Sequence, residues 1–261
     1  MGTTLNKLVF AGQKLNQTRE YNINQLRGHG FITTTRFGNE IVGIFFDTGS
    51  PNTILYSHGN AENIFISYDW YEHLAERLNV NICAYDYSGY GLSSGIASEK
   101  NVYADIDAVF LYLMDIRNIA RSNIILFGCS LGSSPAIYLA SRLSKLAIPP
   151  AAMILQSPLK SVLRIVFDTP RTSSCDMFPN IDHIGDVSCP VFIIHGTMDE
   201  VVPFNHGVDL FEQIRSKYRK KCYWVEGAGH NDLEVIAGRE YLKSISNFLN
   251  EVSISYSNKF V

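Results

Sequence analysis

The chain has 261 residues, of which 46% are hydrophobic and 18% are charged, proportions typical of a globular domain with a sizeable core. The net charge is −3 and no basic block occurs, which argues against a nucleic-acid partner. The 5 cysteines are scattered without a C-x-x-C pair, which indicates neither a zinc site nor a disulfide framework. We therefore expect no metal, no cofactor and a reducing, cytoplasmic environment.

The first part of the chain, residues 1–30, is polar and irregular and is predicted to be an N-terminal extension. Its one apolar group is Leu8, Val9 and Phe10. The first residues lack the apolar core of a signal peptide. No apolar run in the chain approaches the roughly 20 residues that a membrane-spanning helix needs. We therefore expect the protein to contact membranes only weakly and peripherally.

Residues 31–261 are predicted to form a single domain in which short apolar strands alternate with amphipathic helices. The first two strands, residues 31–36 and 41–46, flank a turn and predict a leading β-hairpin. Further strands are predicted at 53–57, 80–85, 124–127, 152–155, 191–194 and 222–225, and helices at 70–78, 98–113, 131–143, 204–218 and 240–252. This order predicts an α/β fold with a mostly parallel central sheet, an antiparallel leading hairpin and helices on both faces.

Residues 128–132, Gly-Cys-Ser-Leu-Gly, lie between a predicted strand and a predicted helix. A G-x-S-x-G pattern in this setting is typical of a nucleophile elbow, the sharp turn that exposes a reactive serine. Glycine is expected at 128 and 132 because side chains there would collide across the turn. We expect Ser130 to adopt a strained backbone conformation. The pattern alone is weak, because it also fits an ordinary glycine-rich turn.

Two later loops supply the residues that a nucleophilic serine needs. A serine hydroxyl requires a base within hydrogen-bond reach, and the base requires a carboxylate that fixes its tautomer. In this fold class the chain order is serine, acid, histidine, each just past a strand end. Asp199 follows the strand at 191–194, and His230 follows the strand at 222–225. The sequence therefore predicts a catalytic triad, with Glu200 or Asp232 as the alternative acid.

The oxyanion of an acyl-transfer transition state needs two N–H donors. One predicted donor is the backbone N–H of Leu131, directly after the nucleophile. The other is the backbone N–H of Asn60, in the loop after the strand at 53–57, with Ala61 as the alternative. His58 and His195 end strands, and we expect them to be structural residues bonded to loop backbone.

Five longer motifs resemble the α/β-hydrolase-domain-17 family of protein depalmitoylases. They are residues 56–61 (Tyr-Ser-His-Gly-Asn-Ala), 85–91 (Tyr-Asp-Tyr-Ser-Gly-Tyr-Gly), 98–108 (Ser-Glu-Lys-Asn-Val-Tyr-Ala-Asp-Ile-Asp-Ala), 178–182 (Phe-Pro-Asn-Ile-Asp) and 224–232 (Trp-Val-Glu-Gly-Ala-Gly-His-Asn-Asp). The resemblance covers roughly residues 30 to 250. It implies an α/β-hydrolase fold, a Ser130–Asp199–His230 triad, and cleavage of long-chain acyl thioesters from protein cysteines.

The chain departs from that family at its beginning. The family members carry an N-terminal cluster of acylated cysteines that anchors them to membranes, whereas here no cysteine precedes Cys83. An acylated anchor is therefore not predicted from the residues of this chain.

The connection between the strands at 152–155 and 191–194 is long and unusually apolar. We predict that residues 157–189 form a short cap-like segment over the active site. Its apolar side chains are predicted to line a groove for a hydrocarbon chain: Leu159, Val162, Phe167, Met177 and Phe178. For about half of the apolar residues in this connection, a short helix packed on the core is the alternative.

Together these features predict a serine hydrolase that forms an acyl-enzyme on Ser130. Its substrate is predicted to be an acylated protein or a small acyl ester, cleaved at a long-chain thioester or ester. A general carboxylesterase and an aminopeptidase-like peptidase are the alternatives, although no acidic cluster for a peptide's amine is evident. A non-catalytic binding module on the same fold is the alternative from another class. The oligomeric state is left open.

Overall fold

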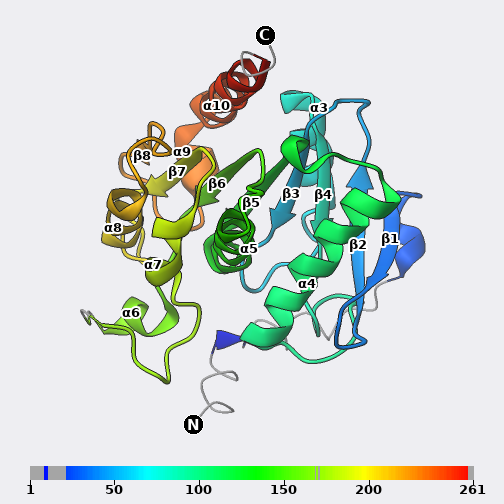
Figure 1. The fold of residues 1–261 in the computed structure, drawn as a ribbon, viewed down its shortest axis with the longest axis horizontal. Coiled ribbons are helices and arrows are strands. Elements are labelled where there is room, and N and C mark those ends of the chain that lie inside the picture. Colours follow the sequence, from blue (N-terminus) through cyan, green and yellow to red (C-terminus); the bar gives the residue numbers. More distant parts are fainter. Residues whose placement is uncertain (1–8, 11–21, 168, 170, 258–261) are drawn as a thin grey trace.

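The structure is a computed structural model that describes residues 9–10, 22–167, 169 and 171–257. Within them, one 8-stranded sheet has the strand order β1-β2-β4-β3-β5-β6-β7-β8 (Figure 1). The strands are β1 (Gly30–Thr34), β2 (Glu40–Phe46), β3 (Thr53–Ser57), β4 (Asn81–Tyr85), β5 (Ile124–Cys129), β6 (Ala152–Gln156), β7 (Val191–Gly196) and β8 (Tyr223–Val225). β1 pairs with β2 and β2 with β4 in antiparallel fashion, and every later pair is parallel. The predicted mostly parallel sheet with an antiparallel leading hairpin is confirmed.

Helices cover both faces of the sheet (Figure 1). The first face packs against α4 (Glu99–Leu111), α5 (Ser133–Lys145) and α8 (Asn205–Gln213), and the second against α3 (Tyr68–Leu78) and α10 (Arg239–Ser257). Successive strand side chains point to opposite faces, so Leu126 of β5 joins the first core cluster and Phe127 the second. None of the described helices is both long and apolar enough to cross a membrane.

The helix predicted at 204–218 is shorter than expected, because α8 ends at Gln213. The next residue, Ile214, has an extended backbone and is buried in the core. The Arg219 guanidinium donates hydrogen bonds to the carbonyl oxygens of Glu212 and Ile214, at 2.5 Å and 2.9 Å. Carbonyls that a longer helix would bond internally are thus satisfied by a side chain from outside the helix.

The connection at 157–189 contains two short helices, α6 (Val162–Val166) and α7 (Asn180–His183). Leu159, Met177 and Phe178 are buried, and Met177 and Phe178 belong to the first core cluster. The Phe178 ring packs edge-on against Phe10, with ring centroids 6.2 Å apart. The prediction that these three side chains line an open acyl groove is therefore wrong: they are core residues.

Two other residues predicted to line the groove differ from these three. Val162 is partly buried against the same core cluster, and Phe167 is 61% exposed at the end of α6. Part of the predicted N-terminal extension also packs onto the domain, because Phe10 and Leu26 are both buried in the core clusters. Most of residues 1–30, including Leu8, lie outside the described residues.

Candidate active site

The turn after β5 has the shape that the sequence predicts. Ser130 has a φ of 50°, in the left-handed region that is strained for a residue with a side chain. A Cβ on Gly128 would lie 2.5 Å from the carbonyl oxygen of Gly132, and a Cβ on Gly132 would overlap the carbonyl of Ser57. Glycine is therefore required at both positions for steric reasons. The Ser133 hydroxyl donates a 2.7 Å hydrogen bond to the Ser130 carbonyl and holds the turn.

The structure brings Ser130, His230 and Asp199 together in one line of hydrogen bonds. They follow β5, β8 and β7, whose carboxyl ends meet at the same edge of the sheet. The Ser130 Oγ lies 3.0 Å from His230 Nε2, and His230 Nδ1 lies 2.7 Å from Asp199 Oδ2. With Nδ1 donating to the carboxylate, Nε2 is left as the acceptor for the serine proton. This is the geometry that proton transfer from serine to histidine needs.

The Asp199 carboxylate is held from several sides. Its Oδ1 accepts hydrogen bonds from the backbone N–H groups of Val201 and Val202, at 3.0 Å and 2.7 Å. Burial alone would raise its pKa, but hydrogen bonds from His195 and His230 bring the pKa well below its ordinary value. The carboxylate therefore stays ionised. The His195 Nε2 also lies 3.0 Å from the Val202 carbonyl oxygen, which confirms the expected bond to loop backbone.

The two alternative acids contact the backbone of the histidine loop. Glu200 Oε2 accepts a 3.2 Å hydrogen bond from the N–H of His230. Asp232 Oδ1 accepts a 2.7 Å hydrogen bond from the N–H of Gly229. Of the three acids considered, Asp199 is thus the one placed against the imidazole ring, and the other two shape the loop that carries it.

The loop after β3 lies directly against the nucleophile, because a Cβ on Gly59 would be 3.9 Å from Ser130 Cβ. The backbone N–H groups of Asn60 and Leu131 have no hydrogen-bond acceptor among the described residues. The side chain of Asn60 donates to the Val9 carbonyl at 2.6 Å and accepts from the Tyr90 hydroxyl at 2.7 Å. The loop is thus anchored by this side chain, and both predicted oxyanion donors stay a prediction.

A buried histidine orients the same loop. His58 Nδ1 donates a 2.7 Å hydrogen bond to the carbonyl of Gly59, which confirms its expected bond to loop backbone. Because C=O and N–H point in opposite directions across a trans peptide, this bond turns the N–H of Asn60 away from His58. On the other side of the ring, Nε2 lies 3.4 Å from Asp86 Oδ1. Burial alone would lower the pKa of His58, but the carboxylate of Asp86 raises it above its ordinary value.

A cavity of 340 Å³ opens beside the nucleophile, and the sequence analysis missed it. Its lining consists of two carboxylates and mostly aromatic, apolar or small side chains: Tyr56, Glu62, Ile66, Ser67, Trp70, Cys129 and Glu234. Burial, and then the charges of Glu62 and Glu234, raise the pKa of Cys129 well above its ordinary value. The two acids are far apart in the sequence. A signal was nevertheless present, because Glu62 lies two residues after Asn60 and Glu234 lies four residues after His230.

The segments around the triad also expose apolar side chains that the sequence analysis did not single out. Met198 and Val201 flank Asp199 and are 67% and 44% exposed. On α9 (Leu233–Ala237), directly after the histidine loop, Val235 is 79% exposed and Ile236 is 52% exposed. These four residues are close to Asp199 or His230 along the chain. Contiguous exposed apolar surface is typical of sites that bind apolar ligands or membranes.

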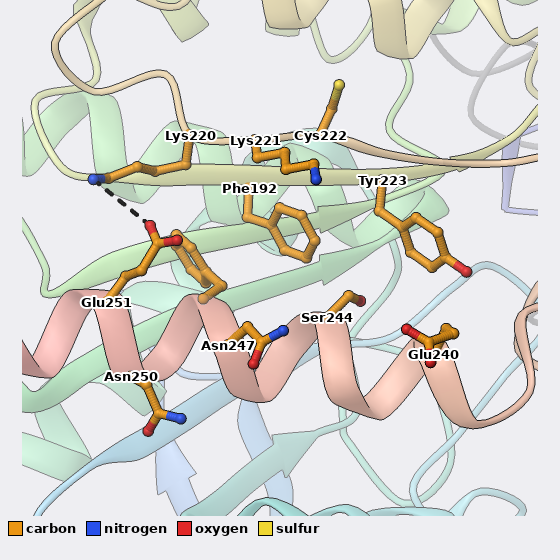
Figure 2. A pocket seen from close by; sticks show the side chains of 11 residues that line it. Phe192, Lys220, Lys221, Cys222, Tyr223, Glu240, Ser244, Asn247, Asn250 and Glu251 are labelled. Atoms are coloured by element: carbon orange, nitrogen blue, oxygen red, sulfur yellow. Dashed lines mark ion pairs between the residues drawn. The ribbon is translucent and has the colours of Figure 1, made fainter.

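A larger cavity, of 580 Å³, lies between the β8 region and α10 and is separate from the triad (Figure 2). Phe192 and Phe248 are among its lining residues, with stacked rings whose centroids are 5.3 Å apart. At its rim Lys220 pairs with Glu251 at 3.9 Å, as Figure 2 shows. Phe192 is near the amino end of β7, whereas Asp199 follows the carboxyl end of that strand. This cavity therefore contributes nothing to the chemistry of Ser130.

The tight turn makes a first prediction. Gly132→Ala should abolish reaction of Ser130 with fluorophosphonate and lower the free energy of unfolding by about 1–3 kcal/mol or more, because the new Cβ overlaps the Ser57 carbonyl. Gly185→Ala is the matched control, since a Cβ there would meet only the Gln213 carbonyl oxygen at 3.6 Å. Thermal unfolding and labelling of both variants measure the two effects. A fully labelled, stable Gly132→Ala variant would contradict the steric argument.

Comparison with known proteins gives a consistent result. A family model described as alpha/beta hydrolase fold matches residues 52–179. Human alpha/beta hydrolase domain-containing protein 17B is 45% identical over 225 residues, covering 85% of this chain and 75% of that protein. The mouse protein 17C is 45% identical over 224 residues, covering 84% of this chain and 67% of that protein.

Solved structures show the same fold at low sequence identity. An alpha-beta hydrolase from Vibrio vulnificus superimposes with a TM-score of 0.72 and 17% identity, covering 94% of this chain and 92% of that chain. An esterase of Pyrococcus furiosus gives a TM-score of 0.71 at 17% identity, covering 90% of this chain and 95% of that chain. The α/β-hydrolase fold expected from the resemblance is confirmed.

Proposed function

The chain belongs to the alpha/beta hydrolase domain-containing protein 17 family, and on this premise we propose that it is a serine hydrolase of long-chain acyl thioesters or esters. Its proposed substrate is an acylated protein, cleaved at a cysteine thioester. The observation that carries the proposal is the unbroken line of hydrogen bonds from Ser130 through His230 to Asp199. We further propose that the protein works in the cytoplasm and meets membrane-bound substrates by peripheral contact.

In the proposed reaction, Ser130 Oγ attacks the acyl carbonyl carbon while its proton passes to His230 Nε2. The resulting oxyanion lies between the backbone N–H groups of Leu131 and Asn60, and the ionised Asp199 stabilises the imidazolium. The intermediate collapses, the carbon–sulfur bond breaks, and the leaving thiol takes the proton from His230. Water then attacks the acyl-enzyme by the same route, which releases a carboxylic acid and restores Ser130.

The preference for a long acyl chain is supported by the apolar side chains that are exposed around the triad. Met198 and Val235 lie on the loops or helices that adjoin the catalytic acid and base, and both are largely exposed. Contact with a hydrocarbon chain would remove their surface from water, at a gain of about 0.8 kcal/mol per buried methylene. We still propose Val162 and Phe167 as further contacts of the acyl chain. Leu159, Met177 and Phe178 are buried and are no longer proposed as contacts.

A series of acyl thioesters from acetyl to palmitoyl tests this function. We expect kcat/KM to rise with chain length well past butyryl, by up to about fourfold per carbon while the chain still finds apolar surface. Met198→Ser and Val235→Ser should flatten the rise and leave acetyl hydrolysis nearly unchanged. Ile116→Ser is the matched control, because Ile116 is also 67% exposed but precedes the amino end of β5. A series that peaks at acetyl or butyryl would contradict the proposal.

The acidic cavity beside Ser130 favours a second candidate, an aminopeptidase-like activity. Glu62 and Glu234 could bind the ammonium group of a peptide, assisted by the ring of Trp70. Glu234 is positioned by a 2.6 Å hydrogen bond from Gln156 Nε2. If this is the activity, aminoacyl p-nitroanilides are cleaved and Glu234→Gln raises their KM, whereas Glu240→Gln on α10 does not. If amides are not cleaved while thioesters are cleaved rapidly, the aminopeptidase-like activity is excluded and only the first proposal is supported.

A further inference from the structure

A cavity of 370 Å³ on the first face of the sheet is lined by three arginines, Arg36, Arg121 and Arg142. It lies between the end of β1, α4, α5 and the short turn Arg121–Asn123 that precedes β5. Asp107 of α4 is the one acidic residue of its lining. The cavity therefore carries two more positive than negative charges, three minus one.

Asp107 is already saturated by its neighbours. Its side chain is 11% exposed, and its two oxygens accept hydrogen bonds from Arg36 at 2.7 Å and Arg142 at 2.6 Å. The Tyr138 hydroxyl donates a third hydrogen bond, at 3.2 Å. The carboxylate thus offsets one of the three guanidinium charges. It has little capacity left to accept a hydrogen bond from the third guanidinium, that of Arg121.

The guanidinium of Arg121 has no hydrogen-bond acceptor or acidic partner among the described residues. The Nε atoms of both Arg121 and Arg142 are buried, and neither has an acceptor there. A buried donor that leaves water without gaining an acceptor costs free energy, so such donors normally meet a partner. Because these two Nε atoms are closed off from solvent, an anion in the cavity would instead meet the terminal guanidinium nitrogens of Arg121, which bond to none of the described residues.

The rest of the lining is mostly apolar. Leu111 and Leu146 stand at the surface, 53% and 60% exposed, and Met114 and Ile148 are partly buried against the core. A bare inorganic anion would leave these side chains in contact with water. An anion that carries a hydrocarbon chain would cover them and would also supply acceptors to the arginines.

We propose that this cavity binds an amphipathic anion, a carboxylate or phosphate group attached to a hydrocarbon chain. None of Ser130, Asp199 and His230 lines this cavity, and Arg121 precedes the amino end of β5 whereas Ser130 follows its carboxyl end, so the cavity is separate from the triad. The occupant is therefore bound independently of the reacting substrate, and the inference does not rest on the proposed function. A free fatty acid and a phosphate-headed lipid are the two sources of this chemistry.

Titration calorimetry on the full chain tests the proposal, with octyl phosphate and octanoate below their micelle concentrations and with inorganic phosphate and octanol as controls. We expect an octyl anion to bind, with affinity rising by about fourfold per methylene between hexyl and octyl chains. Tighter binding of octanoate identifies a fatty acid as the source, and tighter binding of octyl phosphate identifies a phosphate-headed lipid. Equal binding of octanol, equal binding of inorganic phosphate, or no binding of either octyl anion would overturn the proposal.

Variants locate the binding on the cavity. Arg121→Gln should lower the affinity for the octyl anion by about tenfold or more, because a charge-assisted hydrogen bond is lost. The melting temperature of this variant should stay near that of the unmodified chain. Arg77→Gln is the matched control, since it removes the same charge from α3 on the other face of the sheet. Leu146→Asn should reduce the dependence of the affinity on the length of the alkyl chain. Undiminished affinity in Arg121→Gln would place the binding elsewhere and overturn the assignment.

Discussion

Replacing Ser130 by alanine is expected to abolish covalent labelling by a fluorophosphonate and to lower kcat/KM on the order of 10⁴- to 10⁶-fold. The reason is that Ser130 Oγ is the hydroxyl placed 3.0 Å from the accepting nitrogen of His230. Without it, no acyl-enzyme can form, and only hydrolysis assisted by the remaining site persists. Labelling followed by mass spectrometry of the modified peptide measures the first effect, and thioester turnover measures the second.

The neighbouring residue provides the control for this experiment. Cys129 lies half-buried beside the nucleophile, and burial raises the pKa of its thiol well above the ordinary value. It is therefore protonated near neutral pH and should not compete for the reagent. The Cys129→Ala variant should still be labelled at Ser130. If Ser130→Ala is still labelled at full stoichiometry, Ser130 is not the nucleophile and the proposed function fails with it.

Asp199→Asn is expected to lower kcat by about 10⁴-fold while the fold remains intact. An amide at this position can donate to the imidazole and favours the tautomer in which His230 Nε2 carries the proton and cannot accept another. Glu200→Gln and Asp232→Asn are the controls, because their carboxylates contact loop backbone, and both variants should retain most of the activity. Nearly unchanged activity in Asp199→Asn, with either control inactive, would assign the acid differently.

The same residue predicts a dependence of stability on pH. Because the folded-state pKa of Asp199 is lower than the unfolded-state value of about 3.9, its ionised form stabilises the fold above that value. This contribution is lost as the pH falls below about 4. The free energy of unfolding, measured from pH 6 to pH 2, should therefore decline less steeply in Asp199→Asn than in the unmodified chain. Parallel curves for the two proteins would contradict the depressed pKa.

The positions of Ser130, Asp199 and His230 could be predicted because each depends on a local signal. A short apolar run fixes a strand, the strands of a parallel sheet end at one edge, and the residues just past those ends must meet there. The glycines at 128 and 132 were equally readable, because the collisions that they avoid occur within one turn or between neighbouring strands. Local sequence therefore specifies the core of the site.

What could not be predicted depends on packing between distant segments. Phe178 has the same apolar character whether it lines a groove or fills the core, and only its contact with Phe10 decides between them. Glu62 and Glu234 face one cavity because the loop after β3 and the start of α9 converge; their places beside Asn60 and His230 are visible in the sequence, but the cavity between them is not. The three arginines that line the cavity with Asp107 come together for the same reason, from the turn after β1, from α5 and from the turn before β5.

The attachment of Val9 to the loop of Asn60 defines where the catalytic unit begins. The Val9 carbonyl accepts the amide of Asn60, and Phe10 is 4% exposed against Phe178. A truncation that removes both residues would free the Asn60 side chain and open a hole over the aromatic cluster. We therefore expect that the shortest variant with full catalytic activity begins before Val9, well ahead of β1. Turnover of truncated variants, and not only their solubility, measures this limit.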